Sequence, residues 1–79
     1  MLNDQENVFK GKIEFYFANS VKIHIVLKNK EWFNGTIQKV NPDFFVLNES
    51  KKGILPIYYS ELFDVDPYTP ENENKEVKG

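Results

Sequence analysis

The sequence contains no cysteine and no arginine, and none of its hydrophobic runs is long enough to span a bilayer. Without cysteine, the chain can form neither a disulfide framework nor a thiolate metal site. All ten basic residues are lysines, so the guanidinium group that recognises phosphate or guanine through paired hydrogen bonds is missing. After Leu2 the N-terminus is polar and lacks a secretory hydrophobic core. We therefore expect a cytoplasmic protein without a membrane partner.

The size and charge of the chain restrict its function further. Its 79 residues allow one domain, which buries only about 60–65% of its unfolded surface, so self-association is a common remedy. Residues 1–53 carry eight lysines and six acidic residues, whereas residues 54–79 carry two lysines and six acidic residues. The chain therefore lacks the overall basic field of non-specific nucleic-acid binders, and any nucleic-acid site must be local.

Short alternating segments dominate the middle of the chain. Residues 21–28 and 31–40 alternate between apolar and polar side chains, which predicts two half-buried strands. The turn sequence 41–43 ends the second of them. Three further strands are predicted at residues 44–47, 54–59 and 63–68, with turns at 48–53 and 60–62. Five short strands with short turns indicate a mainly β fold, a small barrel.

One glycine interrupts the second predicted strand. Gly35 lies between Phe33 and Ile37, which alternate with it toward the interior. Glycine weakens a strand unless the backbone bends sharply or approaches another segment closely. We therefore expect Gly35 to mark the point where this strand bends to serve both halves of a barrel.

The N-terminal segment permits two interpretations. A helix capped by Asn3 or Asp4 is favoured, although Gly11 costs such a helix about 1 kcal/mol relative to alanine. Its apolar face would consist of Val8, Phe9, Ile13, Tyr16 and Phe17. Ile13, Phe15 and Phe17 also alternate as they would in a strand. At the other end, the polar residues 71–79 are expected to form a disordered tail or an acidic partner-binding segment, which leaves residues 1–70 as the domain.

The segments VKIHIVLKNKEWFNGTIQKV and PIYYSELFDVDPY give the chain a family resemblance. In pattern and spacing, residues 4–68 resemble a divergent member of the Sm-like superfamily, which includes the Sm, Lsm and Hfq proteins. The resemblance implies a strongly bent, five-stranded, SH3-like barrel with an N-terminal helix. It also implies a homo-oligomeric ring, joined edge to edge between the fourth and fifth strands, that binds single-stranded RNA rich in uridine or adenine near its pore.

The resemblance places RNA contacts in two loops, where this chain departs from the family pattern. In the first loop, Asn41 replaces the usual acidic residue and Asp43 stands where a base-stacking residue is usual; a one-residue slip would put Phe44 there instead. In the second loop, Tyr59 could stack on a base and Ser60 could form hydrogen bonds. Packing in the barrel is the alternative for Phe44, and covering the barrel end or a subunit contact is the alternative for Tyr59. The candidate RNA-binding residues are Lys39, Asn41, Asp43, Phe44, Tyr59 and Ser60.

Other distinctive residues have structural explanations. Pro56 removes a hydrogen-bond donor from the fourth strand, which a ring would pair on both sides. His24 is expected at the surface, and Trp32 either at an interface or packed under the N-terminal segment. Lys30, Lys51, Lys52 and other turn lysines are expected to be solvated, with phosphate contact as the second possibility. Asp64 and Asp66 are expected on the solvent face of the last strand.

No combination of residues indicates catalysis, a metal or a cofactor. The single histidine has no second histidine or cysteine to complete a site. We therefore do not expect an enzyme. Two functions remain open: an RNA-binding Sm-like ring, or a protein-interaction scaffold on a barrel that has lost the RNA site and uses Trp32, Tyr58, Tyr59 and the acidic C-terminal half. A monomeric SH3-like barrel is a third possibility, which the molecular mass would distinguish.

Overall fold

The computed structural model describes residues 2–70 and begins with helix α1 (Asp4–Ala18). Asn3 caps this helix: its Oδ1 atom accepts a hydrogen bond of 2.8 Å from the Glu6 amide, and Glu6 Oε1 accepts one of 3.2 Å from the Asn3 amide. This reciprocal capping box satisfies two otherwise unpaired amides at the start of the helix. The preference for a helix over a strand is thus confirmed, with Asn3 rather than Asp4 as the cap.

Only part of the predicted apolar face of α1 points inward. Phe9 and Ile13 are buried, and Tyr16 packs against the same core. Val8 and Phe17, however, are 55% and 44% exposed, so their assignment to this face is wrong. Each helical residue advances by about 100°, which places Val8 to one side of Phe9 and Phe17 to one side of Tyr16. The helix therefore keeps hydrophobic side chains outside the core.

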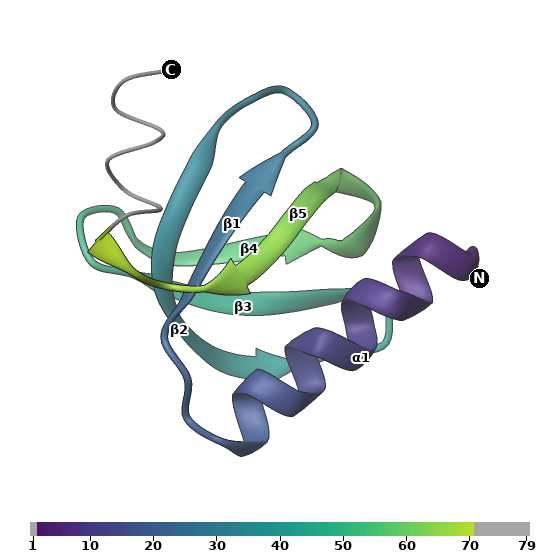
Figure 1. The fold of residues 1–79 in the computed structure, drawn as a ribbon, viewed down its shortest axis with the longest axis horizontal. Helices are drawn as coiled ribbons and strands as arrows, with labels where there is room; N and C mark the ends of the chain where they lie inside the picture. The colour runs from purple at the N-terminus through teal and green to yellow at the C-terminus, as the bar shows by residue number, and fades with distance from the viewer. Residues whose placement is uncertain (1, 71–79) are drawn as a thin grey trace.

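The five predicted strands are present and form one antiparallel sheet in the order β4-β3-β2-β1-β5. The strands are β1 (Ile23–Leu27), β2 (Trp32–Val40), β3 (Phe44–Glu49), β4 (Gly53–Tyr58) and β5 (Leu62–Pro67), with a 3-10 turn, η1 (Tyr59–Glu61), between the last two. The sheet is strongly bent, and α1 lies across one side of it (Figure 1). The mainly β prediction is confirmed, and β4 and β5 are the two edges of the sheet.

Gly35 is the residue at which β2 passes from one neighbour to the other. It pairs with Ile23 of β1 and with Glu49 of β3. A Cβ atom at Gly35 would overlap the carbonyl oxygen of Asn48 and lie 2.9 Å from its carbonyl carbon. The prediction of a bend with close backbone approach is therefore confirmed.

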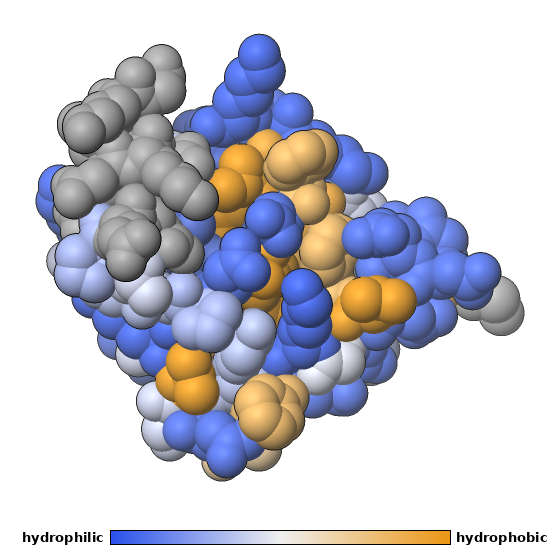
Figure 2. Space-filling model, viewed as in Figure 1, coloured by the Kyte–Doolittle hydropathy of each residue, from blue (hydrophilic) through white to orange (hydrophobic). Residues whose placement is uncertain are grey.

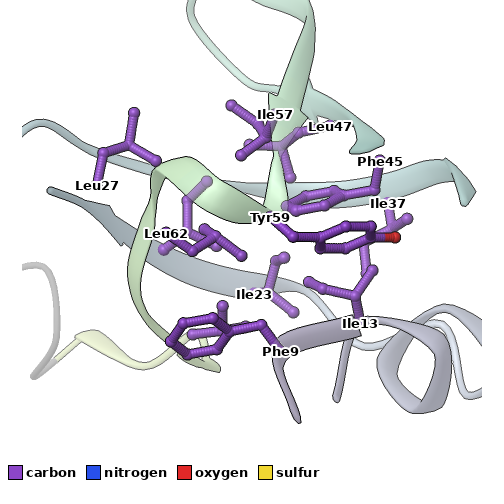
Figure 3. Close-up of a cluster of buried hydrophobic side chains, with 12 residues drawn as sticks. Phe9, Ile13, Ile23, Leu27, Ile37, Phe45, Leu47, Ile57, Tyr59 and Leu62 are labelled. Carbon is purple, nitrogen blue, oxygen red and sulfur yellow. The ribbon is translucent and has the colours of Figure 1, made fainter. Parts of the chain in front are cut away.

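The core lies between the bent sheet and α1. Phe9 and Ile13 reach from the helix toward Ile23 and the stacked rings of Phe45 and Tyr59 (Figure 3). The buried apolar residues are Phe9, Ile13, Ile23, Ile25, Leu27, Ile37, Phe45, Leu47, Ile57, Tyr59, Leu62 and Val65. Helix and sheet therefore share a single core.

His24 lies on the outer face of β1, as its alternation predicts, but it is only 4% exposed. Its Nδ1 atom lies 2.6 Å from Oδ1 of the buried Asn34, a hydrogen bond that the amide oxygen accepts. The ring of half-buried Trp32 has its centroid 5.7 Å away. The prediction of a surface histidine is wrong because β1 is the strand between β2 and β5, so neighbours on both sides cover its outer face.

Two predictions about the chain ends remain open. The polar tail, residues 71–79, lies outside the described residues, as does Met1. The division into a barrel domain, 1–70, and a tail therefore stays a prediction. Within the described range, no helix has both the length and the apolar character needed to cross a membrane.

Candidate functional site

The structure brings together the two loops to which the resemblance assigns RNA contacts. The Tyr59 amide donates a hydrogen bond of 3.3 Å to the carbonyl of Asp43, and the Tyr59 hydroxyl donates one of 3.1 Å to the carbonyl of Asn41. Both loops lie beside the N-terminal half of α1 (Figure 1). The two predicted segments therefore form one continuous surface, which we call the loop surface (residues 39–44 and 58–61).

Tyr59 anchors this surface from inside rather than presenting its ring to solvent. The side chain is fully buried, and its ring centroid lies 5.8 Å from that of Phe45. Burial raises the pKa of its hydroxyl to about 12, with smaller contributions from Glu14 and Asp43. Because the ring of Tyr59 is buried, the prediction that it stacks on a base is wrong for this structure. The alternative prediction, that Tyr59 covers the barrel end, agrees with its position.

Tyr58 is the tyrosine that the structure exposes. It is 48% exposed, and its ring lies over Phe44, its cross-strand partner, with a centroid distance of 5.3 Å. Phe44 is half-buried in this pair, while Phe45 enters the core. The sequence did hold a signal for this arrangement, because Ile57, Tyr58 and Tyr59 alternate in, out and in.

The other predicted residues give the loop surface little positive charge. Asn41 is half-buried, and Lys39, Asp43 and Ser60 are exposed. Exposed Glu61, next to Ser60 in the chain, adds a second carboxylate, and its Oε1 accepts a hydrogen bond of 3.1 Å from the Tyr58 amide. A surface with two carboxylates and one lysine is poorly suited to a polyanion. The loop surface can offer an aromatic ring, but weak electrostatic attraction.

A second surface collects the positive charge that the loop surface lacks. A cleft of about 460 Å³ lies beside the β1–β2 and β3–β4 turns, and Lys22, Lys30, Lys51 and Lys52 line it. Aromatic side chains line the same cleft: Trp32, Phe33 and Tyr68. The Lys22 ammonium lies 4.3 Å from the centre of the Tyr68 ring, and that of Lys52 lies 5.2 Å from the centre of the Phe33 ring. We call this surface the lysine cleft.

The carboxylates in the lysine cleft help to build its turns. The buried Glu49 accepts hydrogen bonds of 3.0 Å and 2.6 Å from the amides of Lys51 and Lys52 through Oε2. Glu31 Oε1 accepts a hydrogen bond of 2.8 Å from the side chain of Asn29. These contacts hold the two turns in the conformations that carry Lys30, Lys51 and Lys52 at the surface. The arrangement can attract phosphates and stack bases on aromatic rings.

The sequence identified several lysines of this cleft only as members of separate turns. Lys30 lies in the β1–β2 turn, whereas Lys51 and Lys52 lie in the β3–β4 turn. The pairing of β2 with both β1 and β3 brings these turns to one place. Alternation within a single strand does not show which turns lie close together in the folded chain. The lysine cleft could therefore not be derived from the sequence.

Asp64 and Asp66 lie on the outer face of β5, as predicted, but both are half-buried rather than freely solvated. Burial and the neighbouring Asp64 carboxylate raise the pKa of Asp66 above its usual value, and Lys12 and His24 partly offset this. Among residues 2–70, no three histidine, cysteine or acidic side chains are grouped so that they could hold a metal ion. Because it carries two carboxylates, the outer face of β5 is unfavourable for binding a polyanion such as RNA.

The helix followed by a bent antiparallel sheet in the order β4-β3-β2-β1-β5 is the Sm-like fold, which confirms the predicted fold class. One solved structure of this fold is that of the pleiotropic translational regulator Hfq; the match covers 75% of this chain and 97% of that chain, with a TM-score of 0.64 and 20% sequence identity. No protein-family model matches the sequence. No curated protein shows significant similarity to it either. The comparison thus confirms the predicted fold.

Proposed function

We propose that this chain is a non-enzymatic, cytoplasmic RNA-binding protein that binds single-stranded RNA and assembles into a homo-oligomeric ring. The observation that carries the proposal is the lysine cleft, in which four lysines and three aromatic side chains converge. The protein shares its fold with Hfq, a translational regulator, and this likeness supports a function of the same class for the present chain. In this proposal the lysine cleft, rather than the residues of the two loops, makes the main contacts with RNA.

The composition of the lysine cleft favours RNA backbone over base sequence. Lysine acts as a flexible point charge, so it contacts phosphates without selecting bases. Stacking on an aromatic ring is also tolerant of base identity, and it contributes about 1–3 kcal/mol per base. The loop surface, with exposed Tyr58, would add a stacking contact. A uridine-rich or adenine-rich preference is the remaining expectation, and it can be measured directly.

The edge strands of the sheet favour assembly into a ring. Within residues 2–70, each of β4 and β5 pairs with one other strand. Exposed edges invite uncontrolled pairing, and joining β4 of one copy to β5 of the next removes them. Pro56 lies in β4 opposite Val46. Proline is tolerated in edge strands. If the nitrogen of Pro56 faces the next copy, the contact between copies lacks at least one backbone hydrogen bond, because proline has no N–H to donate.

A fluorescence titration with labelled oligo-uridine and oligo-adenine at two salt concentrations tests RNA binding. We expect saturable binding that weakens as the salt concentration rises. The slope of the logarithm of the binding constant against the logarithm of the salt concentration should decrease in magnitude by about 0.7 for each contacting lysine that is removed. The variant Lys30→Gln/Lys52→Gln should bind more weakly and with a smaller slope. Lys39→Gln, on the loop surface, is the matched control and should change little. No saturable binding at tens of micromolar would contradict the proposal.

Light scattering tests the ring independently of RNA. A ring predicts a mass of about five to eight chains of 9.3 kDa each, as the family resemblance implies, or twice that, and a mass that does not change with dilution near the working concentration; a mass of two chains would not support it. A single 9.3 kDa species would contradict the ring and favour a monomeric barrel. Because RNA binding is measured separately, the two parts of the proposal can fail independently.

A protein-interaction scaffold is the second candidate, and the exposure of large apolar side chains favours it. Phe15, Tyr58 and Phe63 all reach solvent. These side chains could contact a protein partner without any RNA. Purification of the tagged protein with one partner in stoichiometric amount, unchanged by nuclease treatment, together with no binding in the RNA titration, would favour this candidate.

A further inference from the structure

Helix α1 has a second apolar face, directed away from the core. Val8 and Phe15 are 55% and 62% exposed, and Gly11 and Ala18 are exposed between and beyond them. With about 100° per residue, these four positions fall within about 80° of one another around the helix. We call them the outer stripe. Figure 2 shows hydrophobic side chains reaching the surface over α1.

The spacing of the outer stripe indicates what kind of surface could cover it. Its members follow one another at intervals of three, four and three residues. A helix that packs on one core normally carries polar residues on its opposite face. An apolar repeat with a mean spacing near 3.5 residues instead suits a second helix, whose side chains insert between those of the first. The outer stripe therefore fits a helical partner.

We propose that the outer stripe binds α1 of a second copy, antiparallel, about a two-fold axis that passes near Gly11. In this arrangement, Phe15 of each copy packs against Val8 of the other. An atom added at the Cβ position of Gly11 would have no neighbour within 4 Å, so there is room above Gly11 for an aromatic ring of the second copy. Large and small side chains thus complement one another across the axis.

The charges beside the outer stripe favour the same arrangement. Lys10 and Glu14 lie one turn apart on one flank of the stripe. In an antiparallel pair of helices, equivalent flanks face each other, so Lys10 of each copy meets Glu14 of the other. On the opposite flank, Lys12 is half-buried, and its charge acts on Asp66 of its own chain. Antiparallel helix dipoles also attract.

This contact goes beyond the proposed ring. The outer stripe belongs to α1 and takes no part in the sheet, so it does not use the edges of β4 and β5. If the ring forms, several helix pairs would join two rings face to face, and their weak contacts would act together. If the ring fails, the same contact would give a dimer. The two proposals can therefore be separated.

Cysteine cross-linking tests the axis directly, because the chain has no cysteine of its own. Gly11→Cys should form a disulfide-linked dimer under mild oxidation, since the axis brings both copies of residue 11 together. Val8→Cys should not, because its two copies lie about 10 Å apart along the helix axis, beyond the reach of a disulfide. A mixture of Val8→Cys and Phe15→Cys should cross-link as a heterodimer. No cross-link from Gly11→Cys, or equal cross-linking by Val8→Cys alone, would overturn the proposal.

The mass of the assembly gives a second measurement. Phe15→Ser should halve the mass found by light scattering, whether that mass belongs to two rings or to two single chains. Phe17→Ser, an exposed phenylalanine on a different face of α1, should leave it unchanged. Lys10→Glu should also halve the mass, and Lys10→Glu/Glu14→Lys should restore it. Unchanged masses for Phe15→Ser and Lys10→Glu would overturn the proposal, and circular dichroism would verify that every variant folds.

Discussion

The backbone carbonyl of Asn48 in β3 occupies the space that a side chain at Gly35 in β2 would need. Overpacking of this kind costs about 1–3 kcal/mol, and here the neighbour is backbone, which cannot rotate away. Gly35→Ala should therefore lower the free energy of unfolding by about 3 kcal/mol, as measured by urea denaturation. Gly11→Ala is the control: its Cβ would have no neighbour within 4 Å in its own chain, and at protein concentrations too low for self-association it should stabilise the helix by about 1 kcal/mol. A change within about 0.5 kcal/mol for Gly35→Ala would contradict this account.

The buried hydroxyl of Tyr59 predicts a loss of stability in alkali. Its pKa is raised from 10.0 to about 12, so the folded protein holds this proton more tightly than the unfolded chain. The resulting stabilisation is complete below pH 10 and is lost as the pH rises through 12. Urea denaturation between pH 8 and 11 should show this decline in the wild type, and a smaller decline in Tyr59→Phe. Tyr58→Phe, which changes an exposed tyrosine, should keep the wild-type slope.

The two adjacent tyrosines should differ in their effects on RNA binding and stability. Tyr58→Ala removes an exposed ring and should weaken RNA binding by about 1–3 kcal/mol, with little change in stability. Tyr59→Ala removes a core side chain and should cost about 3–5 kcal/mol of folding free energy. Titration with labelled RNA and thermal denaturation of both variants would measure this. Equal RNA affinity for Tyr58→Ala and the wild type would remove the loop surface from the RNA site.

The Asp64 and Asp66 carboxylates on β5 predict a stabilising substitution. Burial, followed by the effects of Asp64, raises the pKa of Asp66, so its charged form is less favourable in the folded protein than in the unfolded chain. The contribution of Asp66 to the free energy of unfolding is thus greatest below pH 3.8, the usual pKa of its carboxyl group. This contribution is lost as the pH rises through the raised pKa. Asp66→Asn should raise the melting temperature at pH 7, and the gain should vanish near pH 3. Asp43→Asn, on an exposed loop, is the control; an equal gain there would argue against a local cause.

Local patterns in the sequence were sufficient to predict most of the fold. The alternation in residues 21–28 and 31–40 depends only on which side of its own strand each residue occupies, and the predicted strands are present. The position of Gly35 inside such a pattern predicted the bend, because few other backbone situations favour glycine there. The cap at Asn3 is a similar local feature, since its partner, Glu6, lies three residues away.

The candidate sites depended on contacts between distant segments, and there the sequence was less informative. It determined that positive charge is confined to lysines and that His24 lies on the outer side of β1. Only the tertiary structure decided that His24 is covered, that Tyr59 is the buried member of its pair, and that the lysines of two turns line one cleft. The physical reason is that alternation specifies the side of a strand, whereas exposure and convergence depend on which strands and helices lie beside it.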